Sequence, residues 1–103
     1  MLGNNRSLKY LLGWLIMGTR GGTNRAKILE ILKNKPQNAN QFAVLLGLDY
    51  KTVRHHLDIL EKNNLITSVG DRYGVTYFLS QLMDDNYVIF EELNSKNGKK
   101  VSE

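Results

Sequence analysis

Residues 50–63 form the most strongly amphipathic stretch of this chain, and they limit its fold more than any other feature. Because successive residues of an α-helix are turned by about 100°, Val53, Leu57 and Leu60 fall on one face, whereas basic and polar side chains fall on the opposite face. We therefore expect one face to pack on a core and the other to be free to bind. Asp49 is a candidate N-cap for this helix.

The apolar spacing before this segment predicts three more helices. The first covers residues 8–17 and is apolar nearly all round, so it needs packing partners on more than one face, either within the monomer or from a second chain. The second begins at Thr23, a candidate N-cap. A short extended piece then leads to a third helix, which is opened by Asn38 or Asn40 and ended by Gly47.

Two β-rich runs follow, residues 65–69 and 75–79, and the glycine-containing turn between them predicts a hairpin. Residues 80–93 return to helical spacing, and the last residues, 96–103, are expected to form a flexible polar tail. The predicted fold class is mainly α with a small β-hairpin.

Composition and charge exclude several classes of function and indicate the kind of partner. The chain has 103 residues, of which 42% are hydrophobic, and this suits one compact core. Its formal net charge is +4, and most Lys and Arg residues precede residue 79, so this basic part is where a polyanion would bind. The absence of cysteine excludes disulfides, thiolate metal sites and Cys nucleophiles. The apolar run at residues 10–19 is about half the length needed to cross a bilayer, and no signal-cleavage site follows it, so we expect a cytoplasmic protein without a membrane segment.

Motifs for catalysis are missing from the sequence. Residues 18–22 lack the Gly-Lys-Ser/Thr ending and the preceding strand of a phosphate-binding loop, and no nucleophile-elbow or zinc-protease spacing occurs. His55 and His56 are adjacent, so on a helix they point about 100° apart and cannot hold one metal ion together. We predict no enzymatic activity, no catalytic residues, no cofactor and no metal site.

The order of these elements and the pattern of residues 41–60 resemble the winged helix-turn-helix domain of ArsR-like bacterial and archaeal regulators. Ala43 is small where two helices would cross, Gly47 can take the left-handed conformation of the turn, and Val53 packs beneath the second helix. The string TVRHHLDIL at residues 52–60 is similar to the recognition-helix signature of that group. The resemblance implies a winged helix-turn-helix with extra N- and C-terminal helices.

The resemblance covers residues 23–79 and implies sequence-specific binding of double-stranded DNA by a transcription regulator. Recognition helix 50–63 would lie in the major groove, and hairpin wing 65–79 would lie on the backbone or in a minor groove. The predicted DNA-binding residues are Tyr50, Lys51, Thr52, Arg54 and His55 on the helix, with Arg72 and Tyr73 at the hairpin tip.

A homodimer would read two half-sites, which increases both affinity and selectivity. We therefore predict an N-terminal dimerisation helix and linker at residues 1–22, the DNA-binding domain at 23–79, and a C-terminal dimerisation helix at 80–95, although both outer helices could instead cap the monomer core. The predicted dimer-interface residues are Leu8, Leu11, Trp14, Leu15, Leu82, Ile89 and Phe90.

Two other functions stay open. Winged-helix domains also serve as protein-interaction modules without DNA binding, and Tyr73 with Tyr77 could stack on RNA bases. The outward Lys51, Arg54 and His55 favour DNA over a protein partner, and RNA is the weaker alternative because no further base-stacking aromatics are evident on an exposed sheet. The sequence indicates neither the operator and the regulated genes nor the direction of regulation, and it leaves a small-molecule effector unknown.

Overall fold

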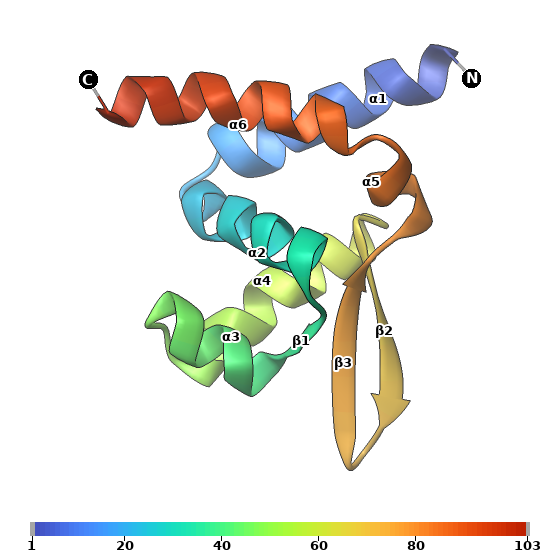
Figure 1. Ribbon diagram of the computed structural model, residues 1–103, viewed down its shortest axis with the longest axis vertical. Helices are drawn as coiled ribbons and strands as arrows, with labels where there is room; N and C mark the ends of the chain where they lie inside the picture. The colour runs from blue at the N-terminus through green and yellow to red at the C-terminus, as the bar shows by residue number, and fades with distance from the viewer. Residues whose placement is uncertain (1, 103) are drawn as a thin grey trace.

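The computed structural model describes the backbone of residues 2–102 and the side chains of residues 6–95. Helices α1 and α6 lie across one end of the molecule, and a β-hairpin projects from the other (Figure 1). The predicted fold class is confirmed: the chain is mainly helical, with a small sheet and extra helices at both ends. The elements run in the order α1 (Leu2–Leu12), π-helix η1 (Gly13–Met17), α2 (Gly22–Asn34), β1 (Gln37–Asn38), α3 (Ala39–Leu46), α4 (Tyr50–Lys62), β2 (Ile66–Asp71), β3 (Gly74–Leu79), α5 (Gln81–Asp85) and α6 (Tyr87–Ser102).

Local hydrogen bonds define the ends of α3. The Gln41 amide donates to the Asn38 side chain at 2.8 Å, and the Asn38 amide donates to the Gln41 side chain at the same distance, which forms a capping box. Gly47 ends the helix with φ 67°, a left-handed conformation that glycine adopts without steric cost. Of the two predicted starts, Asn38 and Asn40, the structure has Asn38 as the N-cap, and the predicted end at Gly47 is confirmed.

The start of α2 differs from the prediction. The helix begins at Gly22 with Gly21 as its N-cap, and Thr23 lies inside its first turn instead of capping it. The reason is that the chain is already turning before Thr23: the Gly22 amide donates to the Thr19 carbonyl at 3.2 Å, and the Arg25 amide donates to the Gly21 carbonyl at 3.1 Å.

The C-terminal segment forms two helices where one was predicted. Ser80 caps α5, because its hydroxyl accepts the Met83 amide at 3.0 Å, and Asn86 then separates α5 from α6. Helix α6 continues to Ser102, beyond the predicted end of the helix. The predicted flexible tail concerns residues 96–103, whose side chains lie outside the described residues.

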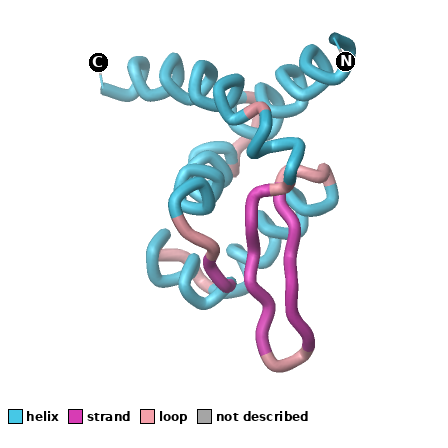
Figure 2. Tube along the Cα trace, turned by 45° about the vertical axis from the view of Figure 1, so that its right-hand side comes forward, coloured by secondary structure: helices cyan, strands magenta, loops and turns pink. Residues whose placement is uncertain are grey.

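The sheet has three antiparallel strands in the order β1-β3-β2, one more than the predicted hairpin. The extended piece after α2 supplies the additional strand, in which Gln37 pairs with Tyr77 and Asn38 pairs with Thr76. Strands β2 and β3 extend past the helices as a wing, and the turn between Asp71 and Gly74 forms its tip (Figure 2).

The core includes the outer helices, and this corrects part of the dimer prediction. Leu8, Leu15 and Phe90 are 3%, 5% and 0% exposed within a single chain, so their side chains pack inside the monomer. Of the other predicted interface residues, Leu11 and Ile89 are half-buried, whereas Trp14 and Leu82 are exposed. The outer helices therefore cap the monomer core.

Polar contacts also attach α5 and α6 to α2. Lys33 forms a 3.4 Å ion pair with Asp84, and Nδ2 of the Asn94 side chain donates to the Glu30 carboxylate at 2.5 Å. Within the described part of the chain, we find no helix that is both long and apolar enough to span a membrane.

Candidate DNA-binding surface

The buried face of α4 determines which of its side chains point toward solvent. Val53, Leu57 and Leu60 are fully buried, as their spacing predicted. Hydrophobic burial of this stripe holds the polar face outward. The predicted DNA-binding side chains of the helix lie on that outward face, with Tyr50, Lys51 and His55 exposed and Thr52 and Arg54 half-buried.

A small hollow of about 100 Å³ lies where α3, α4 and β3 meet. It is polar on balance, and it brings together residues that are distant in the sequence. Tyr50 and Arg54 were predicted for the site, but Asn38 and Asn40 at the start of α3 were not. The lining residues are Asn38, Ala39, Asn40, Tyr50, Arg54, Val75 and Tyr77.

Arg54 provides the charge at this hollow. Its guanidinium lies 3.5 Å from the Asp58 carboxylate one turn further along α4. The neighbouring Tyr77, Asp58 and Tyr50 raise the pKa of Arg54, although partial burial opposes this shift, and the side chain stays cationic. Tyr77 itself is 2% exposed, so of the two tyrosines considered for RNA stacking only Tyr73 is accessible.

Arg72 and Tyr73 lie together at the tip of the wing. Tyr73 is 84% exposed, and the Arg72 guanidinium donates to its hydroxyl at 3.3 Å and lies 5.2 Å from the centre of its ring. The Tyr73 amide donates to the Asp71 carboxylate at 2.8 Å, which shapes the turn. A cation and an aromatic ring thus project from the wing on a turn with internal hydrogen bonds.

A buried polar network joins α4 to the N-terminal helices. Arg25 on α2 is 4% exposed; its Nε donates to the Leu15 carbonyl at 3.0 Å, and its guanidinium also donates to the Thr19 hydroxyl. A second guanidinium nitrogen lies 3.2 Å from Nδ1 of His56 on α4. Because arginine only donates, Nδ1 of His56 accepts, and its ring is neutral in this arrangement. Sequence reasoning considered His56 as a metal ligand and did not identify this partner.

Because of the contact between Arg25 and His56, we expect the folded protein to be less stable in acid. Burial lowers the pKa of His56 below its ordinary value, and Arg25 and His55 lower it further. As pH falls through about 6.5, the unfolded chain binds a proton at this position before the folded chain does, so the free energy of unfolding decreases. Urea unfolding at a series of pH values should show this loss in the wild type and its reduction in His56→Gln. The exposed His55→Gln variant is the control, and an unchanged pH slope in His56→Gln would contradict the assignment.

The two histidines are not arranged as a metal site. The ring centres of His55 and His56 are 5.8 Å apart with planes inclined at 53°, and one side chain is exposed while the other is buried. Among the residues that the structure describes, no group of three or more His, Asp or Glu side chains could hold an ion.

The three helices, the turn at Gly47 and the wing define a winged helix-turn-helix protein, the architecture of transcription regulators. Residues 23–68 match the family described as bacterial regulatory protein, arsR family. This segment of the chain is therefore similar to the helix-turn-helix of that family, which confirms the resemblance seen in the sequence. The matched family is one of bacterial regulatory proteins.

Solved structures agree with this fold. The transcriptional regulator HlyU from Vibrio vulnificus CMCP6 superposes with a TM-score of 0.65 at 22% identity, covering 87% of this chain and 88% of that one. HlyU from Vibrio cholerae N16961 gives 0.67 at 21% identity, covering 87% and 92%. Adhesin competence repressor from Streptococcus pyogenes gives 0.64 at 17% identity, covering 98% and 71%. A sequence comparison with curated proteins gives no match.

Proposed function

We propose that this chain is a cytoplasmic, homodimeric transcription regulator that reads double-stranded DNA with α4 in the major groove. The observation that carries the proposal is the outward face at the start of α4, where Lys51 and His55 are exposed beside Arg54 on a helix locked to the core. An α-helix fits the major groove, and its donors can distinguish all four base pairs there. The β2–β3 wing would place Arg72 on the backbone or in a minor groove.

The hollow beside Arg54 supports the same mode of binding. Asn38 and Asn40 at the start of α3 line the same space as Arg54, whose positive charge suits a backbone phosphate. Contacts to phosphate carry no sequence information, but they would fix how far α4 enters the groove. We therefore add Asn38 and Asn40 to the residues proposed for DNA binding.

Removing the cation at the start of α4 should weaken selected DNA far more than removing one at its end. We expect Arg54→Ala to lower affinity for the tightest-binding duplex by about 10- to 100-fold, because Arg54 would contact a base edge as well as the phosphate beside α4, and a contact to a base edge contributes about 1–3 kcal/mol. Lys62→Ala removes the same charge from the exposed C-terminal end of α4 and should have little effect. Fluorescence anisotropy across a salt series, with duplexes selected from a random pool, measures both.

Equal losses in the two variants would leave only nonspecific attraction to the polyanion and would contradict base reading by α4. Binding that is absent even at low salt would contradict DNA binding itself. That outcome would favour the protein-interaction module, and the exposed Val44 and Leu45 on α3, at 82% and 57%, would be the first surface to test.

Dimerisation is proposed through the exposed side chains that remain on the N-terminal helices. Tyr10, Trp14 and Met17 are 76%, 63% and 43% exposed, and they follow one another at helical spacing along α1 and η1. Large apolar side chains gathered on one surface are typical of protein interfaces. Two copies joined there would read half-sites about 34 Å apart or multiples of that distance.

Trp14→Glu is expected to shift the protein from dimer to monomer, because a carboxylate in the interface would lose its hydration without a partner. Sedimentation velocity over a range of protein concentrations measures this shift. Val69→Glu provides the control, since Val69 is equally exposed, at 64%, but lies on the wing. A wild-type protein that is monomeric at all concentrations, or a dimer unaffected by Trp14→Glu, would contradict the proposed interface.

A further inference from the structure

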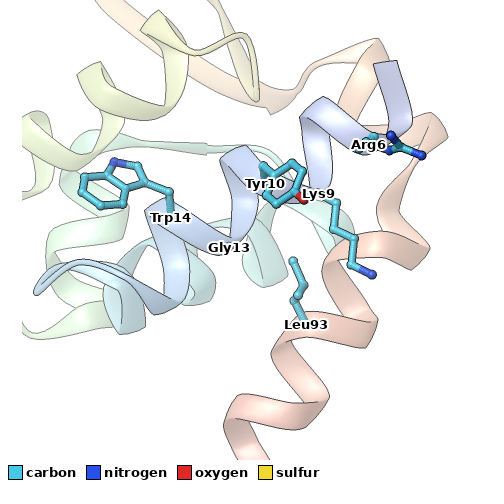
Figure 3. Close-up of a pocket in the computed structure, with 6 residues that line it drawn as sticks. All are labelled: Arg6, Lys9, Tyr10, Gly13, Trp14 and Leu93. Carbon is cyan, nitrogen blue, oxygen red and sulfur yellow. The ribbon is translucent and has the colours of Figure 1, made fainter. Parts of the chain in front are cut away.

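Arg25 lies between the two surfaces that the proposed function uses. It belongs to α2, which packs on both η1 and α4. Helix η1 carries Trp14 and Met17 of the proposed dimer interface, whereas α4 is the proposed recognition helix. Tyr10 and Trp14 project from the N-terminal helices and border a groove beside α6 (Figure 3), which a second copy of the chain would cover in the proposed dimer.

The hydrogen bonds of Arg25 reach from η1 to α4. Its Nε donates to the Leu15 carbonyl in η1, which also accepts the Thr19 hydroxyl at 3.2 Å. Its Nη1 lies 3.2 Å from Nδ1 of His56, the residue that follows the exposed His55 on α4. One buried side chain thus joins the helix of the proposed dimer interface to the proposed recognition helix.

The partners of this buried cation belong to the fold and not to a counterion. Arg25 is 4% exposed, burial lowers its pKa, and among the described side chains no carboxylate lies within 4 Å of it. The Leu15 carbonyl lies in the last turn of η1, where a helix carries partial negative charge that attracts a cation. Because this acceptor is a backbone atom, the guanidinium is attached to η1 itself.

The pair of Arg25 and His56 has little room to shift. A Cβ atom on Gly21 would lie 2.6 Å from both Nη1 of Arg25 and Cε1 of His56, so even a methyl group does not fit beside the pair. Any turn or slide of α4 relative to η1 would also break a buried hydrogen bond and leave a polar atom without its partner. The contact therefore resists movement of α4 on η1.

We propose that Arg25 and His56 are positioning residues that set the distance and the angle between the two α4 helices of the dimer. The inference rests on the proposed function, because it needs both the dimer and the contact of α4 with the major groove. One added base pair moves a half-site by about 3.4 Å and turns it by about 34°. A dimer whose α4 helices are fixed to η1 can follow only one such spacing, so it would discriminate between operators by the spacing of their half-sites.

The test uses duplexes with two copies of the half-site selected from a random pool, whose spacing changes by one base pair at a time, and a duplex with a single copy. By fluorescence anisotropy, we expect the wild type to bind its best spacing about tenfold more tightly than either neighbouring spacing. The double variant Arg25→Met, His56→Leu replaces the buried polar pair with apolar side chains, which protein cores commonly tolerate. It should reduce this preference to about twofold and keep the wild-type affinity for the single half-site.

Two further variants separate positioning from stability. His56→Asn should keep the spacing preference, because its side-chain oxygen can accept from Arg25 in place of Nδ1. Leu32→Ala leaves a cavity beneath α2 about two turns from Arg25, so it should lower the free energy of unfolding without changing the spacing preference. Circular dichroism verifies folding and sedimentation verifies the dimer. If the double variant fails to fold, Arg25→Lys gives the same comparison, since one ammonium nitrogen replaces the planar fork.

The outcomes separate this inference from the proposed function. A double variant with the wild-type preference, or a Leu32→Ala protein that loses the preference to the same extent, overturns the inference and leaves the pair with a structural role only. A wild type that binds every spacing equally also overturns it, while DNA binding itself stands. A wild type without affinity for any duplex contradicts the proposed function and this inference together.

Discussion

Gly22→Ala is expected to lower the free energy of unfolding by about 3 kcal/mol or more, although it adds a single methyl group to the start of a helix. A Cβ atom on Gly22 would lie 1.8 Å from the Ile16 carbonyl oxygen and 2.5 Å from its carbon. Because both are backbone atoms, the clash can be relieved only if η1 and α2 move apart. Urea unfolding followed by circular dichroism measures the loss.

Gly13→Ala is the matched control for this prediction. The same methyl group at Gly13 meets no atom within 4 Å, and alanine is favoured over glycine in helices by about 0.5–1 kcal/mol. We therefore expect this variant to be as stable as the wild type or slightly more stable. Equal tolerance of alanine at Gly13 and Gly22 would contradict the close approach of η1 to α2.

Phe90→Ala is expected to lower the free energy of unfolding by about 3–5 kcal/mol, because it leaves a cavity in the core. Phe90 is fully buried, and its ring makes an edge contact with Tyr87 at 5.2 Å between ring centres. Val88→Ala changes a residue of the same helix that is 60% exposed, and it should cost less than about 0.5 kcal/mol.

The Phe90 variant also separates the two roles considered for the C-terminal helix. A core residue lowers the stability of each chain, so the loss should appear in urea unfolding at low protein concentration, where self-association contributes little. A Phe90→Ala protein with normal stability and weakened self-association would return this residue to the dimer interface.

Local patterns predicted most of the fold. The apolar period placed α3 and α4, the pair Asn38 and Gly47 placed the ends of α3, and the glycine-containing turn placed the hairpin. Each of these signals acts between residues that are close in sequence. The start of α2 was missed for the same reason, because Thr23 looks like a cap locally, while the turn made by Thr19 and Gly21 decides where the helix begins.

Contacts between distant segments could not be predicted from the sequence. A helix that is apolar nearly all round does not show which face a partner covers, so Leu8 and Leu15 could be assigned either to the core or to a second chain. The pairing of β1 with β3 depends on tertiary folding, and only two residues carry it.

The same distinction holds for the candidate site: its local features were predictable from the sequence, and its contacts between distant segments were not. The face of α4 follows from its period, so the exposure of Lys51 and His55 was predictable. The hollow was not, because Asn40 and Arg54 line one space only once α3 and β3 are packed against α4. The contact between Arg25 and His56 joins residues 31 positions apart, and no local pattern reports such a pair.

The network around Arg25 limits how the helix-turn-helix segment can be transplanted. The ArsR-like match covers residues 23–68, yet the carbonyl that receives Arg25 belongs to Leu15, outside the match. A chimaera that grafts only the matched segment onto a foreign scaffold would leave Nε of this buried guanidinium without its acceptor behind α4. Protein engineers who exchange recognition helices among such regulators would need to carry η1 with the module, or to redesign Arg25 and His56 as an apolar pair.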